Sequence, residues 1–208
     1  MATAIDERTP YNGSHTRKVY YYTSLIVDHI NDLFDKWLVD DFFDDNRKDQ
    51  ILLAAALHDI GKMIVPLSVM NKATRLEDRL TIVENRFDKL SLLYERDFYR
   101  GDICAEENDK MQQYIENAMD FIRQKNSADF MPDEDMEKIK DIASHFYTYP
   151  DGEKLFFLTD EERDCLLIRK GTLTDDERRI MESHVVMTKK ILSGVHFNKK
   201  YENALKYA

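Results

Sequence analysis

The sequence contains few of the residues that break secondary structure: six glycines and four prolines in 208 residues. An all-β protein needs turn residues every few positions, so this scarcity argues against that class. Cysteine is scarce as well, because Cys104 and Cys165 lie far apart and form no CxxC pair. Neither a disulfide framework nor a zinc knuckle is therefore expected, and a reducing compartment is the simplest location.

Long apolar runs are also missing. No run approaches the roughly 18 residues that a membrane-spanning helix needs, and the start MATAIDE is too acidic and polar for a signal peptide. Positive charge is in deficit: 30 basic residues face 40 acidic ones, for a net charge of −10. We therefore expect a cytoplasmic chain with no membrane segment and no long nucleic acid as partner. A small phosphate ligand in a metal-lined pocket stays compatible with this charge.

What the sequence does contain is helical periodicity. Hydrophobic residues make up 43% and charged residues 34% of the chain, which is typical of a globular protein. Apolar residues recur at three- and four-residue steps, the spacing of one helix face. The segments with this spacing are 14–40, 76–90, 111–122, 136–146 and 180–191. Trp37 belongs to the first stripe and Phe146 to the fourth. Because strand signals are nearly absent, the predicted fold class is all-α.

A different pattern occupies residues 47–59. Ile51 to Leu57 are apolar on all sides, which predicts a helix that is buried all round. Gly61 follows and suits a helix C-cap, where a glycine adopts a positive φ. A buried helix that leads directly into His58 and Asp59 is unusual, because charged groups in the interior need partners.

Local signals mark the second half of the chain. The residues Tyr-Pro-Asp-Gly at 149–152 predict a loop. Thr159 with Glu162, and Thr174 with Glu177, both have the spacing of a capping box. Each pair therefore predicts the start of a helix.

Titratable residues on these apolar stretches indicate a metal site. His58 and Asp59 stand at a helix end, where both can turn toward one cavity. His15 and His184 each lie on an apolar helix face, where a lone histidine is more often a core residue. Several such groups in the interior are costly unless they share a metal. Imidazole and carboxylate ligands together suit Mn²⁺, Fe²⁺ or Zn²⁺.

The string LHDIGK at 57–62 resembles the signature of the HD-domain metal-dependent phosphohydrolases. Segments 11–19, 64–72 and 170–185 occur in the same order as the flanking segments of the HD-GYP branch and resemble them. The resemblance implies an HD-domain helical bundle with a helical insertion. It also implies hydrolysis of a small phosphodiester, typically the cyclic dinucleotide cyclic di-GMP, a bacterial second messenger in signal transduction.

Carried over by position, the resemblance implies four metal ligands: His15, His58, Asp59 and His184. Asp59 would bridge two divalent metals, and Lys62 would approach the substrate phosphate. Asp59 and Lys62 are then the catalytic residues, and Lys62 and Lys72 are the substrate-binding ones. Fe, Mn and Zn all suit these ligands. Two such metals can activate a water and clamp the phosphoryl oxygens during in-line attack.

The chain departs from the family pattern at two places. Trinuclear members carry a glutamate where Tyr11 stands, which favours two metals over three. The family also continues with a paired-histidine segment and the Gly-Tyr-Pro loop, whereas the sequence ends at Ala208. We therefore expect a fragment with an incomplete metal site. A single domain over 1–208 is expected, with a core at about 8–75 and 158–208 and an insertion at about 76–157.

Two other functions stay open at this point. One is an HD hydrolase that acts on other nucleotides or phosphate esters. The other is a non-catalytic signalling or binding module that uses the HD scaffold for contacts. The helices of the insertion are expected to form a core first and a dimer face second. A homodimer and a fused sensor domain are both compatible with the sequence.

Several residues have a simpler interpretation beside the functional one. Lys62 also suits a helix end through its interaction with the helix dipole. Lys72 and Arg75 could reach a phosphate, and a surface role explains them equally well. His29 and His196 are expected at the surface. The acidic residues of the segment 40–45 are expected to form a solvated loop.

Overall fold

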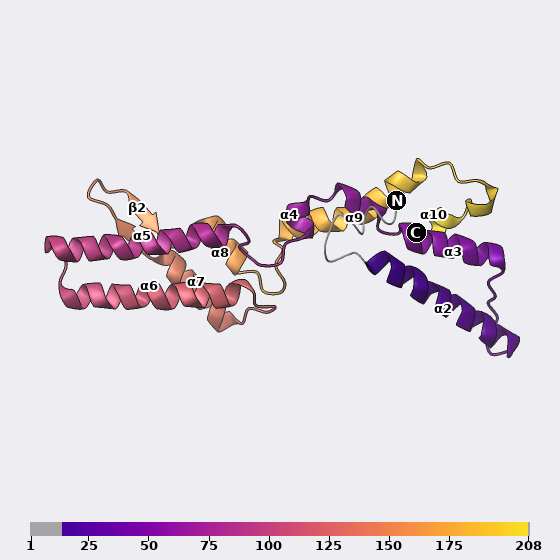
Figure 1. Cartoon of the computed structure of the whole chain (residues 1–208), viewed down its shortest axis with the longest axis horizontal. Coiled ribbons are helices and arrows are strands. Elements are labelled where there is room, and N and C mark those ends of the chain that lie inside the picture. The colour runs from indigo at the N-terminus through magenta and orange to yellow at the C-terminus, as the bar shows by residue number, and fades with distance from the viewer. Residues whose placement is uncertain (1–13, 208) are drawn as a thin grey trace. The chain divides into compact units, whose positions relative to one another are not determined.

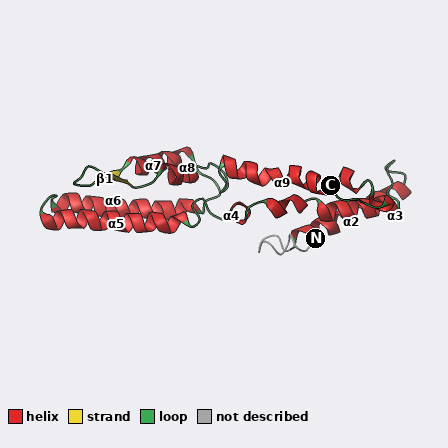
Figure 2. Ribbon diagram, turned by 90° about the horizontal axis from the view of Figure 1, so that it is seen from above, coloured by secondary structure: helices red, strands yellow, loops and turns green. Residues whose placement is uncertain are grey.

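The computed structural model describes residues 14–207 of the chain (Figure 1). Helices make up most of this range, and Figure 2 shows only short strands among them, which confirms the all-α fold class. The chain divides into two compact units: unit 1 comprises residues 1–71 and 175–208, and unit 2 comprises residues 72–174. Tyr11 and the rest of the segment 1–13 lie outside the described residues, as does Ala208.

Unit 1 is built from helices at both ends of the chain. Its first part contains α2 (His15–Asp35), α3 (Asp45–Leu57), the 3-10 helix η1 (Ile60–Ile64) and α4 (Leu67–Met70). Its second part contains α9 (Asp175–Ser193), the 3-10 helix η2 (Lys199–Tyr201) and α10 (Ala204–Tyr207). Helix α2 packs against α3, and α9 packs against η1. The site residues of the first part therefore meet a helix from the second part.

The first helix ends earlier than the sequence predicts. Helix α2 ends at Asp35, because Trp37 adopts a left-handed φ of 60°. The N–H groups of Trp37 and Leu38 donate to the carbonyls of Phe34 and Leu33, at 2.9 and 3.0 Å. This is the Schellman pattern of helix ends, in which glycine is the usual left-handed residue. The prediction that Trp37 belongs to a buried stripe is wrong, since its side chain is 94% exposed.

The buried face of α2 also differs from the predicted one. Thr16 and Val27 are buried, whereas Tyr22 and Ile26 of the predicted stripe are exposed. Runs of neighbouring apolar residues in this helix fit two adjacent faces almost equally well. Periodicity alone therefore did not identify the face that packs against α3.

The side chains of helix α3 are less buried than its composition predicts. Leu52 and Ala54 are buried, but Ile51 is only half-buried, so burial on every side is wrong. The helix begins after Asp44, whose carboxylate accepts a hydrogen bond from the N–H of Arg47 at 2.7 Å. This N-cap explains why the acidic segment gives way to a helix at this residue.

Gly61 does not have the predicted role of a positive-φ C-cap. Helix α3 ends at Leu57, and Gly61 lies within η1 with an ordinary φ. It is buried where η1 meets α9. A Cβ atom at Gly61 would lie 2.0 Å from the backbone oxygen of His184 and 2.6 Å from the backbone nitrogen of Thr188. Glycine is needed here because two backbones approach too closely for any side chain.

Unit 2 contains the remaining helices and a small hairpin. Its elements are α5 (Arg79–Arg100), α6 (Ala105–Asn126), α7 (Asp133–Ser144), β1 (Phe146–Thr148), β2 (Lys154–Phe156) and α8 (Asp160–Leu166). Helices α5 and α6 run side by side (Figures 1 and 2). Their predicted stripes are confirmed, because they supply buried core residues: Val83, Phe87, Leu90, Ile115, Met119 and Ile122.

The fourth predicted stripe is correct only in its first part. Ile139 is buried on α7, but this helix ends before Phe146, which begins β1. Strand β1 pairs antiparallel with β2, and Phe146 lies opposite Phe156. The loop predicted at 149–152 is the turn of this hairpin, where Gly152 has a φ of 88°. Phe146 is therefore a strand residue, and assigning it to a helix was wrong.

One capping box is present as predicted. The Thr159 hydroxyl accepts a hydrogen bond from the N–H of Glu162 at 3.3 Å, and the Glu162 carboxylate accepts one from the N–H of Thr159 at 2.8 Å. Helix α8 begins directly after this cap. The helix start predicted by the pair Thr174 and Glu177 is also confirmed, because α9 begins at Asp175. The hydrogen bonds of this second box stay a prediction.

Arg75 is the most deeply buried charged residue of the described chain, at 0% exposure. Its guanidinium donates to the carbonyls of Ile168, at 3.1 and 3.2 Å, and of Lys125, at 2.9 Å, and also to the carbonyl of Ala128. Both interpretations from the sequence, a phosphate contact and a surface role, are wrong. Arg75 instead joins the end of α6 and the loop that follows it to the segment after α8, within unit 2.

The described residues contain neither a disulfide nor a helix that could span a membrane. Cys104 is exposed and Cys165 is buried, and both are free thiols. None of the described helices has both the length and the apolar character that crossing a membrane requires. The predicted limits of the core, about 8–75 and 158–208, and of the insertion at 76–157 stay predictions.

Candidate metal centre

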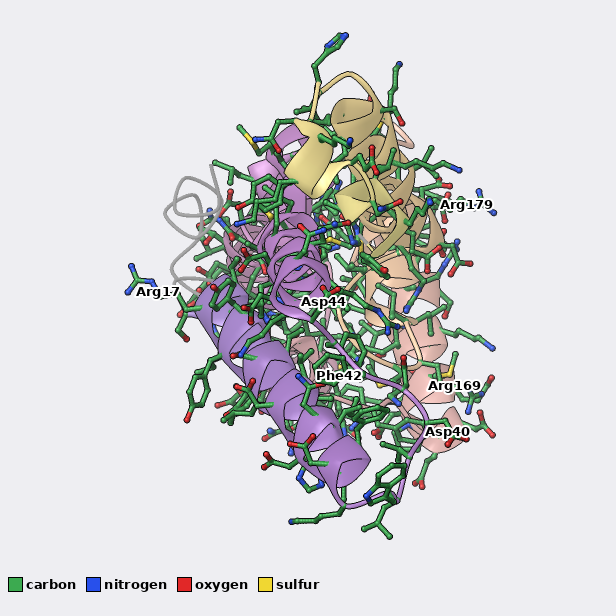
Figure 3. All side chains as sticks on the ribbon, turned by 90° about the vertical axis from the view of Figure 1, so that its right-hand side faces the viewer. Arg17, Asp40, Phe42, Asp44, Arg169 and Arg179 are labelled. Atoms are coloured by element: carbon green, nitrogen blue, oxygen red, sulfur yellow. The ribbon has the colours of Figure 1, made fainter. Side chains whose placement is uncertain are left out.

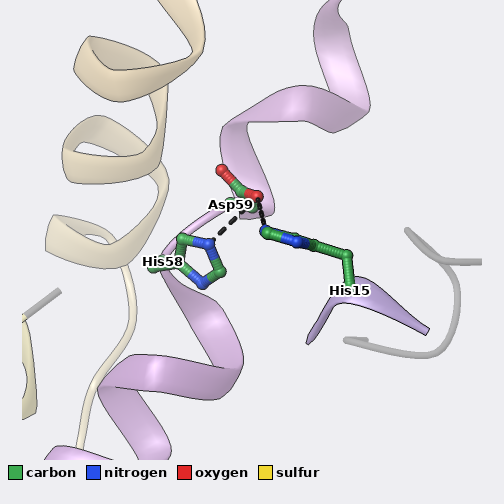
Figure 4. A group of neighbouring side chains, drawn as sticks. All are labelled: His15, His58 and Asp59. Carbon is green, nitrogen blue, oxygen red and sulfur yellow. Dashed lines mark ion pairs between the residues drawn. The ribbon is translucent and has the colours of Figure 1, made fainter. Parts of the chain in front are cut away.

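The candidate site is built at the ends of two helices of unit 1. His15 is the first residue of α2, and His58 directly follows α3 as its C-cap. Asp59 comes next and starts η1 as its N-cap. Neighbouring residues in mid-helix point about 100° apart. Here the chain changes from an α-helix to a 3-10 helix between the two residues, so both side chains face one point (Figure 4).

Asp59 is the centre of this group. Its side chain is 8% exposed, and its Oδ2 lies 3.0 Å from Nε2 of His58 and 3.4 Å from Nε2 of His15. The two imidazole rings are 5.5 Å apart between centroids. One ligand atom from each of the three residues lies within 4.8 Å of the other two, which is close enough to hold one metal ion.

Hydrogen bonds to the backbone fix how the imidazoles present their nitrogens. Nδ1 of His58 lies 2.8 Å from the carbonyl of Ala55, and Nδ1 of His184 lies 2.5 Å from the carbonyl of Met181. A carbonyl oxygen only accepts, so Nδ1 carries the proton in both residues. Nε2 is then free to bind a metal. Metal-binding histidines usually donate their second ring N–H in this way.

The pairing of His58 with Asp59 requires a cation. A neutral His58 with its proton on Nδ1 would direct the lone pair of Nε2 at a carboxylate oxygen, and two acceptors 3.0 Å apart repel. Without a metal, a proton on Nε2 fills this place, and the hydrogen bond to Asp59 raises the pKa of His58 despite partial burial. Burial alone would raise the pKa of Asp59, but the hydrogen bonds from His58 and Lys62 lower it well below its usual range.

These distances and ligands fit a divalent metal. Two ligand atoms that each lie about 2.1 Å from one metal are separated by about 3.0 Å at a right angle and about 3.4 Å at a tetrahedral angle. The separations of Asp59 Oδ2 from the two Nε2 atoms, 3.0 and 3.4 Å, match this range. An imidazole and carboxylate set suits Zn²⁺, Fe²⁺ or Mn²⁺.

The two other predicted residues of unit 1 also contact Asp59. Nε2 of His184 lies 3.5 Å from Oδ1 of Asp59, the oxygen that does not face His15 and His58. Nζ of Lys62 donates to Oδ2 at 2.8 Å. Four groups that are cationic or can be protonated therefore surround a single buried carboxylate.

His184 reaches the site through the contact between η1 and α9. The N–H of Gly61 donates to Oγ1 of Thr188 at 2.9 Å, and both residues are buried. Thr188 stands one turn after His184 on α9, so this hydrogen bond lies beside the candidate metal ligands. Sequence reasoning missed Thr188. The i, i+4 spacing from His184 was its only signal, and nothing local linked it to Gly61.

Lys72 and the acidic segment 40–45 are the other residues with a predicted role. Lys72 belongs to unit 2, where its carbonyl accepts a hydrogen bond from the hydroxyl of Thr172 at 3.0 Å. Its role in substrate binding stays a prediction. Asp40 and Asp44 lie on the segment that joins α2 to α3 and are exposed, as Figure 3 shows. Asp41 in the same segment is also exposed and pairs with Arg47 at 2.5 Å. Residues 40–44 are therefore the expected solvated loop, whereas Asp45 is the first residue of α3 and was wrongly assigned to it.

Comparison with known protein families matches the chain to a family model. A family model described as "HD domain" matches residues 12–125, which is more than half of the chain. The matched range contains His15, His58 and Asp59 but not His184. No curated protein and no solved structure matches the chain significantly.

Proposed function

This chain belongs to the HD-domain family of metal-dependent phosphohydrolases, and we propose that it hydrolyses a small phosphodiester, with cyclic di-GMP as its substrate. One observation carries the proposal. The carboxylate of Asp59 lies within 3.5 Å of the Nε2 atoms of three histidines. These come from the start of α2, the C-cap of α3 and the middle of α9. The choice of cyclic di-GMP rests on the resemblance of the segments around LHDIGK to the HD-GYP branch.

We propose that two divalent metals bind here, with Asp59 shared between them. Its Oδ2 faces His15 and His58, and its Oδ1 faces His184. A carboxylate that binds one metal through each of its oxygens needs a further metal ligand beside each oxygen. The histidines supply these ligands. Bound metals would supply Lewis-acid activation of a water nucleophile and of the phosphoryl group.

The side chains of this chain would orient the substrate and hold its charge. The side chain of Lys62 is 19% exposed and its ammonium donates to Asp59, so it lies at the rim of the ligand group. There it can donate to a phosphoryl oxygen when metals take over the neutralisation of Asp59. The net charge of −10 does not oppose an anionic substrate, because bound metals reverse the local field where the phosphate sits.

The test is a turnover assay with Mn²⁺ or Fe²⁺ on a substrate panel of cyclic di-GMP, nucleoside phosphates and simple phosphate esters. We expect the linear dinucleotide or GMP to appear from cyclic di-GMP, and Asp59→Asn to abolish this. An exposed control, Asp41→Asn, keeps wild-type turnover. Turnover of nucleoside phosphates alone would mean that these, and not cyclic di-GMP, are the substrate. Tight binding of cyclic di-GMP without any turnover would favour a signalling module instead.

A further inference from the structure

The start of η1 contains an unusual exchange of hydrogen-bond partners. Asp59 occupies the N-cap of this helix, and aspartate at an N-cap normally accepts a hydrogen bond from the N–H two or three residues on. Within the described chain, the Asp59 side chain makes no such cap bond. Its carboxylate instead faces Lys62 and the histidines of the candidate site.

The unused N–H is satisfied from a distant part of the chain. Gly61 is the second residue of η1, where a helix has no internal acceptor for the backbone N–H. Its N–H donates to Oγ1 of Thr188, which lies 127 residues away in sequence. Thr188 is 3% exposed, so water does not compete for this bond. The threonine therefore performs the capping that Asp59 would otherwise perform.

The same contact fixes the helix that carries His184. The backbone of Gly61 approaches α9 so closely that an added Cβ would meet the His184 oxygen. The hydroxyl of Thr188 accepts a buried hydrogen bond in this contact, and it lies one turn from His184. Loss of this bond would affect the site at two points: it would remove a tie between α9 and η1, and it would free the Gly61 N–H to attract the Asp59 carboxylate.

We infer that Thr188 is a positioning residue of the metal centre: by capping Gly61 it keeps the Asp59 carboxylate available to a metal and holds His184 opposite it. Without the hydroxyl, the Asp59 side chain turns back to cap its own helix, as local side-chain acceptors do when a backbone donor is free. This inference rests on the proposed metal centre.

The test compares Co²⁺ affinity, followed by the visible absorption of the bound ion, in variants of the full chain. Thr188→Val keeps the shape but removes the hydroxyl, and we expect it to bind Co²⁺ about 10- to 100-fold more weakly, as loss of an outer-sphere partner does. Thr188→Ser keeps the hydroxyl and should bind like the wild type. A shift of the Gly61 amide resonance in Thr188→Val, measured by NMR, is expected independently of any metal, because the acceptor of this N–H changes from a hydroxyl to the Asp59 carboxylate.

A matched control separates positioning from general loss of packing. Leu192 is 2% exposed and packs with Ile60 in the same contact between α9 and η1. Leu192→Ala should lower the melting temperature and leave Co²⁺ affinity close to that of the wild type. Equal loss of affinity in Leu192→Ala, or in Thr188→Ser, would overturn the inference.

The two proposals fail in different ways. If the wild type binds no Co²⁺, the metal centre is wrong and the role of Thr188 falls with it. If the wild type binds Co²⁺ and Thr188→Val binds it equally well, the metal centre stands and only the positioning role is wrong.

Discussion

Nε2 of His58 lies 3.0 Å from Oδ2 of Asp59, although the two residues are neighbours in sequence. The end of α3 at Leu57 and the start of η1 at Ile60 make this possible, because the backbone direction changes between them. The Nδ1–H of His58 is engaged by the carbonyl of Ala55, so Nε2 meets the carboxylate. A proton on Nε2 or a bound metal must lie between these two atoms, so the local fold creates a place that favours a cation.

The close contact between η1 and α9 makes Gly61 intolerant of any side chain. We expect Gly61→Ala to lower the free energy of unfolding by about 3 kcal/mol or more, because overpacking against backbone cannot be relieved by a rotamer change. Urea denaturation measures this effect. Gly194→Ala is the matched control, since its Cβ would meet only the oxygen of Ile191 at 3.4 Å. Equal unfolding free energies for the two variants would contradict the close approach at Gly61.

Arg75 should stabilise unit 2 more than any exposed arginine does. Arg75→Leu leaves several buried carbonyls without a donor, at about 1–3 kcal/mol for each such group. We expect a loss of about 3 kcal/mol in thermal or urea unfolding. Arg75→Lys keeps the charge but not the planar fork of donors, so it should lose less.

Arg179 provides the control for Arg75. Its side chain is 78% exposed and pairs only with Asp176 among the described residues. Arg179→Leu should change stability by no more than about 0.5 kcal/mol. A loss in Arg75→Leu as small as that in Arg179→Leu would mean that the buried guanidinium contacts are not formed.

The stability of unit 2 should depend on pH through Glu162. Burial raises the pKa of Glu162, but the hydrogen bonds from Arg86, at 2.5 and 2.9 Å, and from the backbone N–H of Thr159 outweigh it and lower the pKa below 4.5. A carboxyl group with a lowered pKa stabilises the fold above its unfolded pKa. That stabilisation is lost as the pH falls through the lowered, folded value.

The comparison of wild type with Glu162→Gln measures this contribution. We expect the wild type to be more stable by about 1.5–3 kcal/mol at neutral pH, the worth of hydrogen bonds to a charged group. The difference should shrink as the pH falls below 4.5. Glu161→Gln, at an exposed neighbouring site, should differ from wild type by less than about 0.5 kcal/mol throughout. A difference for Glu162→Gln that does not change with pH would rule out this pair as the cause.

Features that depend on local sequence were predictable. The stripes of α5 and α6 have one apolar face each, so periodicity identified core residues such as Val83, Phe87 and Ile122. The capping box of Thr159 could be predicted because it involves only Thr159 and Glu162, which are three positions apart. The chemistry of His58 and Asp59 was visible because two polar residues end an apolar helix.

Features that depend on distant partners were not predictable. Gly61 was assigned to a C-cap because its true neighbours on α9 lie more than 120 residues away in sequence. Arg75 was interpreted as a surface or phosphate residue because its acceptors belong to two other segments. Trp37 was placed on a helix stripe because a tryptophan does not by itself indicate the left-handed conformation that ends α2.

The most direct test of the metal centre is calorimetric titration of the metal-free chain with Mn²⁺. Wild type and Asp41→Asn should bind the ion alike, because Asp41 lies in the solvated loop. Asp59→Asn should bind it more than about 100-fold more weakly, since it loses a direct ligand and not only an outer-sphere partner. Mn²⁺ binding of equal affinity in wild type and Asp59→Asn would contradict the assignment of His15, His58 and Asp59 as a metal site.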